Sequence, residues 1–204
     1  MKLGIFGGTF DPIHNAHLFV AESARILEGL DRVLFVPTNN QHYRNAAQVG
    51  PEHRCAMVLG AIASNPAFKL DDTDLRKDAT GYTADLLPRL REKYPDAQFT
   101  FIIGADSLAN STWERFDEVL ESLERFVVAP RTGVRPDALQ RVLAAVPKNL
   151  RERIATLNLP ELPESATLIR TLLSQNKSVR YLVPEPVWQY IVSQKLYGAG
   201  SAGA

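Results

Sequence analysis

The sequence is poor in cysteine. Cys55 is the only cysteine among the 204 residues, so an internal disulfide is excluded, and so is a metal site built from several thiolates. An excess of charge of one sign is also missing, because 23 Lys and Arg residues are balanced by 23 Asp and Glu residues. Without net charge, the molecule as a whole has no field that attracts nucleic acid or an anionic membrane. Any phosphate site must therefore be built from a few local groups.

Long hydrophobic runs are absent as well. No apolar stretch approaches the roughly 20 residues that a membrane-spanning helix needs, and the opening MKLGIFGGTF lacks the apolar core of a signal peptide. These features predict a cytoplasmic protein with neither a membrane nor a nucleic acid as partner. The length suits one domain. We expect this domain to span 1–197, with C-terminal helices from about residue 165 and a flexible small-residue tail at 198–204.

Short runs rich in β-branched and aromatic residues alternate with longer helical patterns along the chain. The expected strands are 2–6, 32–37, 67–72, 98–104, 125–130 and 154–159. The expected helices are 17–28, 51–64, 83–94, 116–123, 136–146, 167–175 and 186–194, the third with a kink at Pro88. This alternation predicts the α/β class, with a doubly wound parallel sheet and a small C-terminal helical part. In such sheets ligands bind beyond the carboxyl ends of the strands, so the segments that follow strands are candidate site segments.

The stretch GIFGGTFDPIHNAH, residues 4–17, includes the end of the first expected strand and the segment after it. At Gly7 and Gly8 a ligand can approach the backbone without obstruction by a Cβ atom, and the helix that follows offers free N–H groups to an anion. The stretch is not a Walker A loop, because no Gly-Lys-Ser/Thr follows, and it is not a GxGxxG fingerprint. A nicotinamide-dependent dehydrogenase is therefore disfavoured. We interpret Asp11 as a brace for the Asp-Pro turn rather than as a metal ligand.

His14 and His17 are spaced so that both fit on one side of a first helical turn. As zinc ligands the pair lacks a third partner nearby, since Cys55 is solitary and no HExxH pattern exists. As capping or core residues the two histidines would be unremarkable. Beside a glycine-rich loop at the end of a strand, we favour a third interpretation, in which the imidazole N–H groups donate to phosphate oxygens.

ESATLIR, residues 164–170, is a second candidate phosphate site near the far end of the chain. Ser165 is a good N-cap, and Ser165 and Thr167 place two hydroxyl groups at a helix N-terminus. Arg170 follows about one turn later and can offer several donors to one phosphate. The alternative interpretation is an ordinary capped helix with a solvated arginine.

Both stretches resemble motifs of one superfamily. GGTFDPIHNAH is similar to the GxFDPxHxGH signature of the nucleotidyltransferases with paired histidines, with Ala16 in place of the usual glycine. ESATLIR is similar to the ISSTxIR motif of that superfamily, with Ala166 in place of one serine. The resemblance implies a Rossmann-like nucleotidyltransferase fold in which His14, His17 and Arg170 are catalytic. The ATP and phosphate site that it implies consists of Gly7, Gly8, Thr9, Phe10, Ser165, Thr167 and Arg170.

Segments in the middle of the chain bear on the acceptor. Trp113 follows the fourth expected strand, where it could be a core residue or a platform on which a flat pyridinium ring stacks. Tyr82 and Thr83 start a helix whose free amides can bind a carboxylate. Arg44 follows the second expected strand and could bind the phosphate of a mononucleotide.

FIIGADSL with Trp113, YTADLL and the closing VPEPVWQYIVSQKLYG resemble the nicotinate mononucleotide adenylyltransferase family, and the resemblance covers nearly the whole chain. It implies ATP and nicotinate mononucleotide as substrates, Mg²⁺ as cofactor, ring stacking on Trp113 and carboxylate binding at Thr83. The implied acceptor-binding residues are Arg44, Tyr82, Thr83, Gly104, Asp106 and Trp113. Two departures touch this pocket: 41–44 reads QHYR where the family has PPHK or PPHR, and 81–83 reads GYT in place of SYT.

The expected reaction is an in-line attack by the acceptor's phosphate oxygen on the α-phosphorus of ATP, with pyrophosphate as the leaving group. A phosphate monoester, whose second pKa is about 6, is already a nucleophile at neutral pH. This agrees with a sequence in which no Ser-His-Asp or Cys-His arrangement is apparent. The open alternatives are nicotinamide mononucleotide or phosphopantetheine as the acceptor, and a nucleotide-binding regulator without turnover. The oligomeric state, including a homo-oligomer, is open as well.

Overall fold

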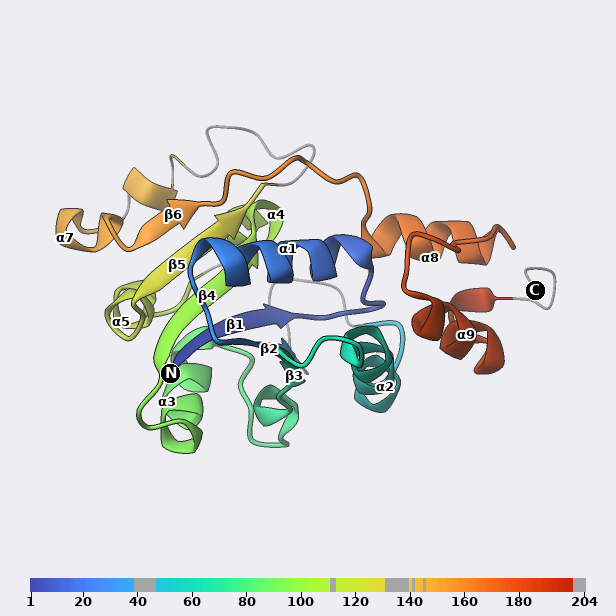
Figure 1. Ribbon diagram of the computed structural model, residues 1–204, viewed down its shortest axis with the longest axis horizontal. Coiled ribbons are helices and arrows are strands. Elements are labelled where there is room, and N and C mark those ends of the chain that lie inside the picture. The colour runs from blue at the N-terminus through green and yellow to red at the C-terminus, as the bar shows by residue number, and fades with distance from the viewer. Residues whose placement is uncertain (39–46, 111–112, 131–139, 141, 145, 200–204) are drawn as a thin grey trace.

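A parallel β-sheet lies at the centre of the protein (Figure 1). The computed structural model describes residues 1–38, 47–110, 113–130, 140, 142–144 and 146–199. Within these residues the strands are β1 (Lys2–Gly8), β2 (Arg32–Pro37), β3 (Phe68–Leu70), β4 (Gln98–Gly104), β5 (Arg125–Ala129) and β6 (Ile154–Thr156). Their order across the sheet is β3-β2-β1-β4-β5-β6, and every neighbouring pair is parallel. The predicted doubly wound sheet is therefore confirmed, with β1 and β4 at its centre.

Helices connect successive strands, and further helices come after the last strand. They include α1 (Asn15–Leu27), α2 (Pro51–Ile62), α3 (Thr83–Lys93), α4 (Ala105–Asn110), α5 (Phe116–Glu121), α7 (Lys148–Arg151), α8 (Ala166–Ser174) and α9 (Glu185–Ser193), with 3₁₀ turns η1 (Thr73–Leu75) and η2 (Leu196–Gly198). Two of them, α4 and α7, are not predicted from the sequence. Helix α3 continues through Pro88, which lies on its exposed side. The predicted helix 136–146 lies mostly outside the described residues.

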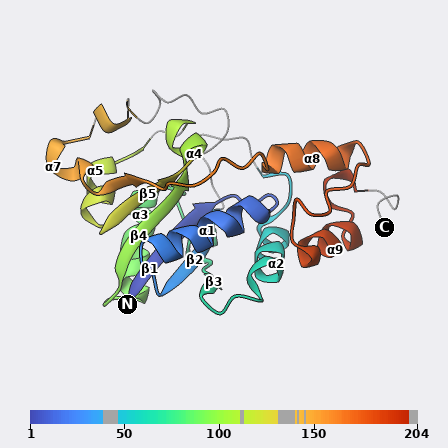
Figure 2. The same cartoon turned by 45° about the horizontal axis from the view of Figure 1, so that its top comes forward.

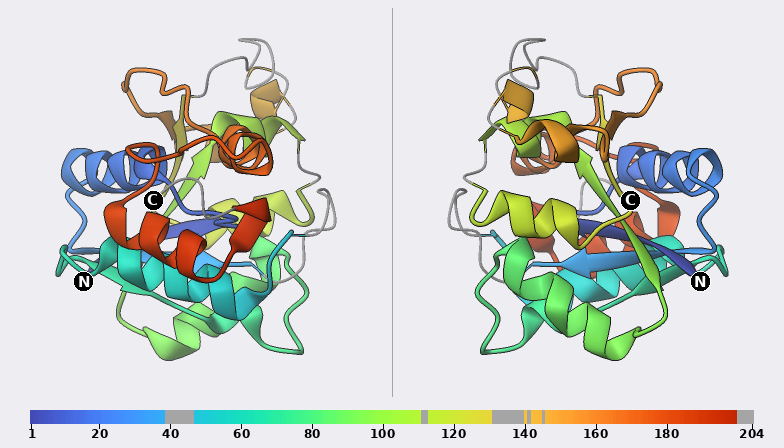
Figure 3. Two further views of the ribbon diagram at one scale, coloured as in Figure 1. Left: turned by 90° about the vertical axis from the view of Figure 1, so that its right-hand side faces the viewer. Right: turned by 90° about the vertical axis from the view of Figure 1, so that its left-hand side faces the viewer.

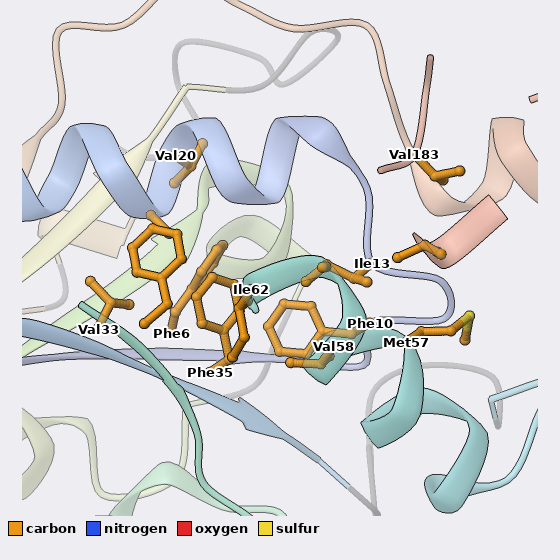
Figure 4. Packing of buried hydrophobic residues seen from close by; sticks show 14 of the residues in the cluster. Phe6, Phe10, Ile13, Val20, Val33, Phe35, Met57, Val58, Ile62 and Val183 are labelled. Carbon is orange, nitrogen blue, oxygen red and sulfur yellow. The ribbon is translucent and has the colours of Figure 1, made fainter. Parts of the chain in front are cut away.

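The sheet separates two hydrophobic cores, because successive residues of a strand face opposite sides. On β1, Phe6 packs with α1, α2, α8 and α9 into the first core, whereas Leu3 and Ile5 pack with α3, α4 and α5 into the second. The end-on views of Figure 3 show helices on both sides of the strands. In the first core Phe6, Phe10 and Phe35 cluster below α1 and beside α2 (Figure 4). The turn that follows β1 is therefore anchored in the first core.

The predicted C-terminal helical part consists of α8, α9 and η2. It lies beyond the carboxyl end of β1, next to α2 and the start of α1 (Figures 1 and 2). Helix α9 packs against α2, and η2 packs against α8 and α9. Gly198 belongs to η2 and Ala199 is buried, so the prediction of a flexible tail from 198 is corrected for these two residues. In the described part of the chain, no helix combines the length and apolar character that a membrane crossing requires.

Candidate active site

Strand β1 ends in Gly7 and Gly8, and the turn that follows leads directly into α1. Gly8 leaves little room for a side chain, because a Cβ atom there would lie 3.0 Å from Cζ of Phe10. The backbone of Phe10 is left-handed, with φ of 49°, and its side chain is 2% exposed. The predicted contact of Phe10 with ATP is therefore restricted to its backbone, because the ring is a core residue.

The two histidines lie on the first turn of α1, as their spacing predicts. His14 is the N-cap and His17 is the third helical residue, and their rings stack with centroids 3.7 Å apart. The backbone N–H of His14 donates to Nδ1 of His17 at 3.2 Å. Nδ1 of His17 is thus an acceptor, and Nε2 carries the proton of the neutral ring. His14 is fully buried and His17 is only partly buried, so an anion reaches His17 first.

The second predicted phosphate stretch meets the first. Ser165 is the N-cap of α8, as predicted, and its Oγ accepts from the N–H of Leu168 at 3.2 Å. Arg170 donates from Nη1 to the carbonyl oxygen of Asp11 at 2.6 Å and from Nη2 to Oγ1 of Thr167 at 3.3 Å. Segments 159 residues apart are thereby joined. Nε of Arg170 is buried and has no hydrogen-bond partner among the described residues, and the two bonds above use two of the five N–H donors of the guanidinium.

Asp11 braces the turn, as the sequence predicts. Its buried carboxylate accepts from the hydroxyl of Tyr197 at Oδ1 and from the N–H of Gln48 at Oδ2, both at 2.7 Å. Close by, Nη1 of the buried Arg54 donates to the carbonyl oxygen of Thr9 at 2.6 Å. Burial lowers the pKa of Arg54, and the Asp11 carboxylate opposes this shift. Arg54 is not among the predicted site residues. Its position on the buried face of a helix is the clue that could have identified it, because arginine is rarely buried without a partner.

A cavity that is open to solvent lies beside the glycine turn. Its walls are formed by Gly7, Gly8, Thr9, Val36, Thr38, Asp74, Gly81, Thr83, Leu86, Phe101, Ile103, Ser107 and Trp113. The cavity therefore joins part of the predicted phosphate site to part of the predicted acceptor site. Thr38, Asp74 and Ser107 are not among the predicted site residues. Each follows the end of a strand, which is the signal that could have found them.

Trp113 is both a wall of the cavity and a part of the second core. Its ring packs edge-on against Phe101 and Phe126, with centroids 6.2 and 5.3 Å apart, and tilted against Phe116 at 5.0 Å. The indole N–H is buried and has no hydrogen-bond partner among the described residues. The two interpretations of this residue, core or platform, are therefore compatible.

The N-terminus of α3 lies at the cavity, where Gly81 and Thr83 form part of the wall. The N-cap residue Tyr82 makes no side-chain cap bond, although its own N–H donates to Oγ1 of Thr80 at 3.3 Å. A carboxylate would therefore bind the amides that follow Tyr82. Gly81 has a φ of 79°, a conformation that favours glycine. In the first turn, hydrogen bonds from Thr80 and Arg115 hold the pKa of Asp85 below its ordinary value and partly neutralise its charge.

Asp74 is a buried carboxyl group in the cavity wall, with 7% of the residue exposed. Burial disfavours its charged form and raises its pKa to about 6, although a hydrogen bond from Thr38 and the charge of Arg89 oppose the shift. The cavity wall therefore contains a carboxyl group that ionises only slightly below neutral pH.

Several predicted residues lie beside the cavity without forming its wall. Tyr82, Gly104 and Asp106 are sequence neighbours of lining residues but do not line the cavity themselves, and Arg44 lies outside the described residues. Over the described ranges of the chain, no group of three or more His, Cys, Asp or Glu side chains could hold a metal ion. The structure thus unites Thr83 and Trp113 with the glycine turn and leaves the remaining predicted acceptor contacts untested.

The parallel sheet, the glycine turn with stacked histidines and the arginine from α8 form the arrangement expected of a nucleotidyltransferase. In agreement, the model of the Cytidylyltransferase-like family matches residues 5–172.

Relatives narrow this class. A protein of Symbiobacterium thermophilum named "Probable nicotinate-nucleotide adenylyltransferase" is 38% identical over 203 residues, which cover 98% of this chain and 97% of the relative. A protein of the same name from Corynebacterium kroppenstedtii is 40% identical over 206 residues, or 100% and 94% of the two chains. The fold is similar to that of Plasmodium falciparum nicotinic acid mononucleotide adenylyltransferase complexed with NaAD, with a TM-score of 0.75, 19% identity and 98% coverage of both chains. The chain belongs to the nicotinate-nucleotide adenylyltransferase family, which confirms the resemblance found in the sequence.

Proposed function

We propose that the protein transfers the adenylyl group of ATP to nicotinate mononucleotide, forming nicotinate adenine dinucleotide and pyrophosphate in NAD biosynthesis. The observation that carries this proposal is the 2.6 Å hydrogen bond from Arg170 to the carbonyl oxygen of Asp11. This bond joins the two proposed phosphate-binding stretches. The same turn also reaches the cavity, because Thr9 lines it together with Trp113. Relatives of which the chain covers nearly the whole length carry the name of this activity.

The chemistry asks for positioning and charge stabilisation more than for a base. A phosphate oxygen of the acceptor attacks the α-phosphorus of ATP, and the bond from the α-phosphorus to the bridging oxygen of the β-phosphate breaks as pyrophosphate leaves. A phosphate monoester, with a second pKa of about 6, is already ionised at neutral pH, so no proton has to be removed. The protein's task is therefore to hold two nucleotides in line and to stabilise the charge on the phosphates.

On the phosphate side, His17 donates its Nε2–H to a phosphate oxygen. The Arg170 guanidinium contributes its positive charge and the Nη donors that its bonds to Asp11 and Thr167 leave unused. The hydroxyl groups of Ser165 and Thr167 and the backbone amides of the glycine turn complete this set. His14 has no exposed surface, so it contacts a phosphate only after the turn rearranges around the nucleotide. Because the carbonyl oxygens of Thr9 and Asp11 already accept from arginines, they repel an incoming anion less.

On the acceptor side, the pyridine ring stacks on Trp113 and the nicotinate carboxylate binds the free amides around Thr83. The uncapped end of α3 supports this assignment, because a helix N-terminus favours an anion. We retain Arg44, Tyr82, Gly104 and Asp106 as proposed acceptor contacts from the family resemblance.

Mg²⁺ enters with ATP as a complex of the triphosphate, whose oxygens are the hard ligands that this ion prefers. When bound, it neutralises charge on the leaving pyrophosphate. Because the reaction consumes ATP, we place the enzyme in the cytoplasm, and its two partners are the small-molecule substrates.

A second candidate acceptor is nicotinamide mononucleotide, and Asp74 is the observation that favours it. A carboxyl group with a pKa of about 6 in the cavity wall is ionised above that pH. An ionised carboxylate accepts hydrogen bonds from an amide and repels a second carboxylate. Rising pH should therefore shift the preference of the pocket from the acid toward the amide.

The test is to measure pyrophosphate release from ATP and Mg²⁺ with nicotinate mononucleotide, nicotinamide mononucleotide or phosphopantetheine in parallel, at pH 5.5 and pH 8. We expect the highest kcat/KM with nicotinate mononucleotide and a relative gain for the amide at the higher pH. Turnover only with phosphopantetheine would identify a different enzyme of this fold. No turnover with any of the three, despite ATP binding, would favour the regulator.

A further inference from the structure

Asp11 joins three distant segments to the turn between β1 and α1. Its carbonyl oxygen accepts from Arg170 of α8, and its carboxylate accepts from the backbone N–H of Gln48 and from the hydroxyl of Tyr197. The residue is 4% exposed, so losing any one of these donors would leave a buried oxygen atom of Asp11 without that compensation. The bond to Tyr197 spans 186 residues, from the turn to nearly the end of the described chain.

Tyr197 reaches Asp11 at a cost in backbone conformation. Within and before η2, Lys195 and Tyr197 adopt φ values of 52° and 56°, and Gly198 follows with 78°. L-residues other than glycine rarely adopt this left-handed conformation, and it persists where the surroundings dictate it. Burial and the neighbouring Asp11 carboxylate raise the pKa of Tyr197, so its hydroxyl group keeps the proton that it donates.

We propose that Tyr197 is a positioning residue for adenylyl transfer: through Asp11, its hydroxyl group holds the turn that carries His14 and His17 in register with Arg170. In this role Tyr197 contacts neither substrate. This inference rests on the proposed function, because Tyr197 would support the phosphate side of the same site.

The acceptor side should not depend on this contact. Tyr197 packs against the first core, whereas Trp113 packs against the second, on the other side of the sheet. Neither Tyr197 nor Asp11 is part of the cavity wall. Loosening the bond between them should disturb the histidine turn and Arg170 while leaving the binding of the pyridine ring unchanged.

The chain offers a matched control in Tyr190. This residue also belongs to the C-terminal helical part and also packs, partly buried, against the first core. Its hydroxyl group contacts Nδ1 of His53 on α2 at 3.0 Å, away from the turn after β1. Tyr197→Phe and Tyr190→Phe each remove one hydroxyl group and keep the ring, so they differ chiefly in which contact is lost.

The experiment uses the full chain of the wild type and of both variants. It measures kcat, the KM for ATP and for nicotinate mononucleotide, the Tm, and the Kd for ATP by calorimetry. For Tyr197→Phe we expect kcat/KM for ATP to fall about tenfold or more, because a misplaced site loses rate steeply. The KM for nicotinate mononucleotide should change less than about twofold, since ring stacking tolerates small displacements. Tyr190→Phe should lower the Tm less than Tyr197→Phe, because its partner His53 is only partly buried, and should leave turnover close to that of the wild type.

Two outcomes would overturn the proposal: wild-type kcat/KM for ATP in Tyr197→Phe, or an equal loss of turnover in both variants, which would indicate general packing. Failure of the proposed function is recognised separately, because the wild type itself would then show no turnover. The Kd for ATP still decides the matter in that case. The proposal requires weaker ATP binding in Tyr197→Phe than in Tyr190→Phe, and equal binding in both would reject it.

Discussion

The two halves of the candidate site are held in place by different forces. The phosphate half is formed by the turn after β1 and the start of α8. The turn is fixed by hydrogen bonds from Arg54 of α2, Arg170 of α8 and Tyr197 of η2. The acceptor half is the cavity wall around Thr83 and Trp113, and the indole is fixed there by aromatic packing. One half is a network of directional polar contacts, and the other is a packed apolar surface.

This difference follows from what each half has to do. Stabilising charge on phosphates requires donors placed to within a fraction of an ångström before the reaction starts, and only a network of directional contacts provides that. Stacking a flat ring tolerates small displacements, because the interaction depends on overlap rather than on one hydrogen-bond angle. The chemical step and acceptor binding should therefore be separable by mutation.

The largest expected effect belongs to the phosphate half. His17→Ala should lower kcat about 100-fold or more, because it removes a donor that acts on the transition state, and the Tm should change little. Steady-state kinetics and thermal unfolding measure the two quantities. His53→Ala is the control, since this histidine contacts Tyr190 and lies outside the site. Near-normal turnover of His17→Ala would contradict its assigned role.

The acceptor half should respond in KM instead. Trp113→Ala should raise the KM for nicotinate mononucleotide about tenfold or more, the usual scale for losing a stacking partner, with a much smaller change in the KM for ATP. Because the indole also packs against Phe101 and Phe126, the comparison needs Trp113→Phe, which keeps an aromatic wall. An increase confined to the KM for ATP would show that the pocket is assigned to the wrong substrate.

Asp74→Asn tests the electrostatics of the acceptor half. Because burial raises the folded-state pKa of Asp74 from 3.8 to about 6, the wild type should lose stability as pH rises from about 4 to 7. The variant should lack this loss and gain about 1 to 2 kcal/mol relative to the wild type at pH 8, less than the full shift implies because the amide is also buried. Urea unfolding at pH 4.5 and pH 8 measures the difference. A stability difference that is the same at both pH values would reject the raised pKa.

Gly81→Ala should have the smallest effect. The left-handed φ of 79° at the cavity rim makes any Cβ atom unfavourable there, so we expect a loss of about 1 kcal/mol in unfolding free energy. Gly60→Ala in α2 is the matched control, for which we expect the free energy of unfolding to rise rather than fall. A Cβ at Gly60 makes only ordinary contact, 3.4 Å from Pro186, and alanine favours the helix by about 0.5–1 kcal/mol. Equal effects of both substitutions would show that the turn at Gly81 tolerates side chains.

Much of the fold could be predicted because the signal was local. Apolar runs ending in Gly, Pro or Asp gave every strand, although β3 and β6 are only three residues long in the structure. Helix α4 escaped prediction because it starts at Ala105, directly after the last residue of β4. Its first residues therefore read as a strand end followed by a loop. The order of the strands depends on pairing across the sheet, and no local pattern states it.

The site was predictable where a motif names its residues. His14, His17, Ser165 and Arg170 lie where their patterns placed them. Asp74 was missed because it lies in a polar stretch directly after the expected strand 67–72, and its burial arises from contact with the segment after β2.

The contact between Tyr197 and Asp11 was equally out of reach for local patterns. It depends on how a C-terminal turn docks against the other end of the chain, across 186 residues.

Because the central sheet divides the interior into two cores, each half of the site has its own foundation: Phe10 beneath the phosphate turn and Phe126 behind Trp113. A lineage could therefore replace the second core and the pocket above it, and so adopt a new acceptor, without disturbing the machinery that handles the triphosphate. The same partition gives protein engineers a boundary along which to graft.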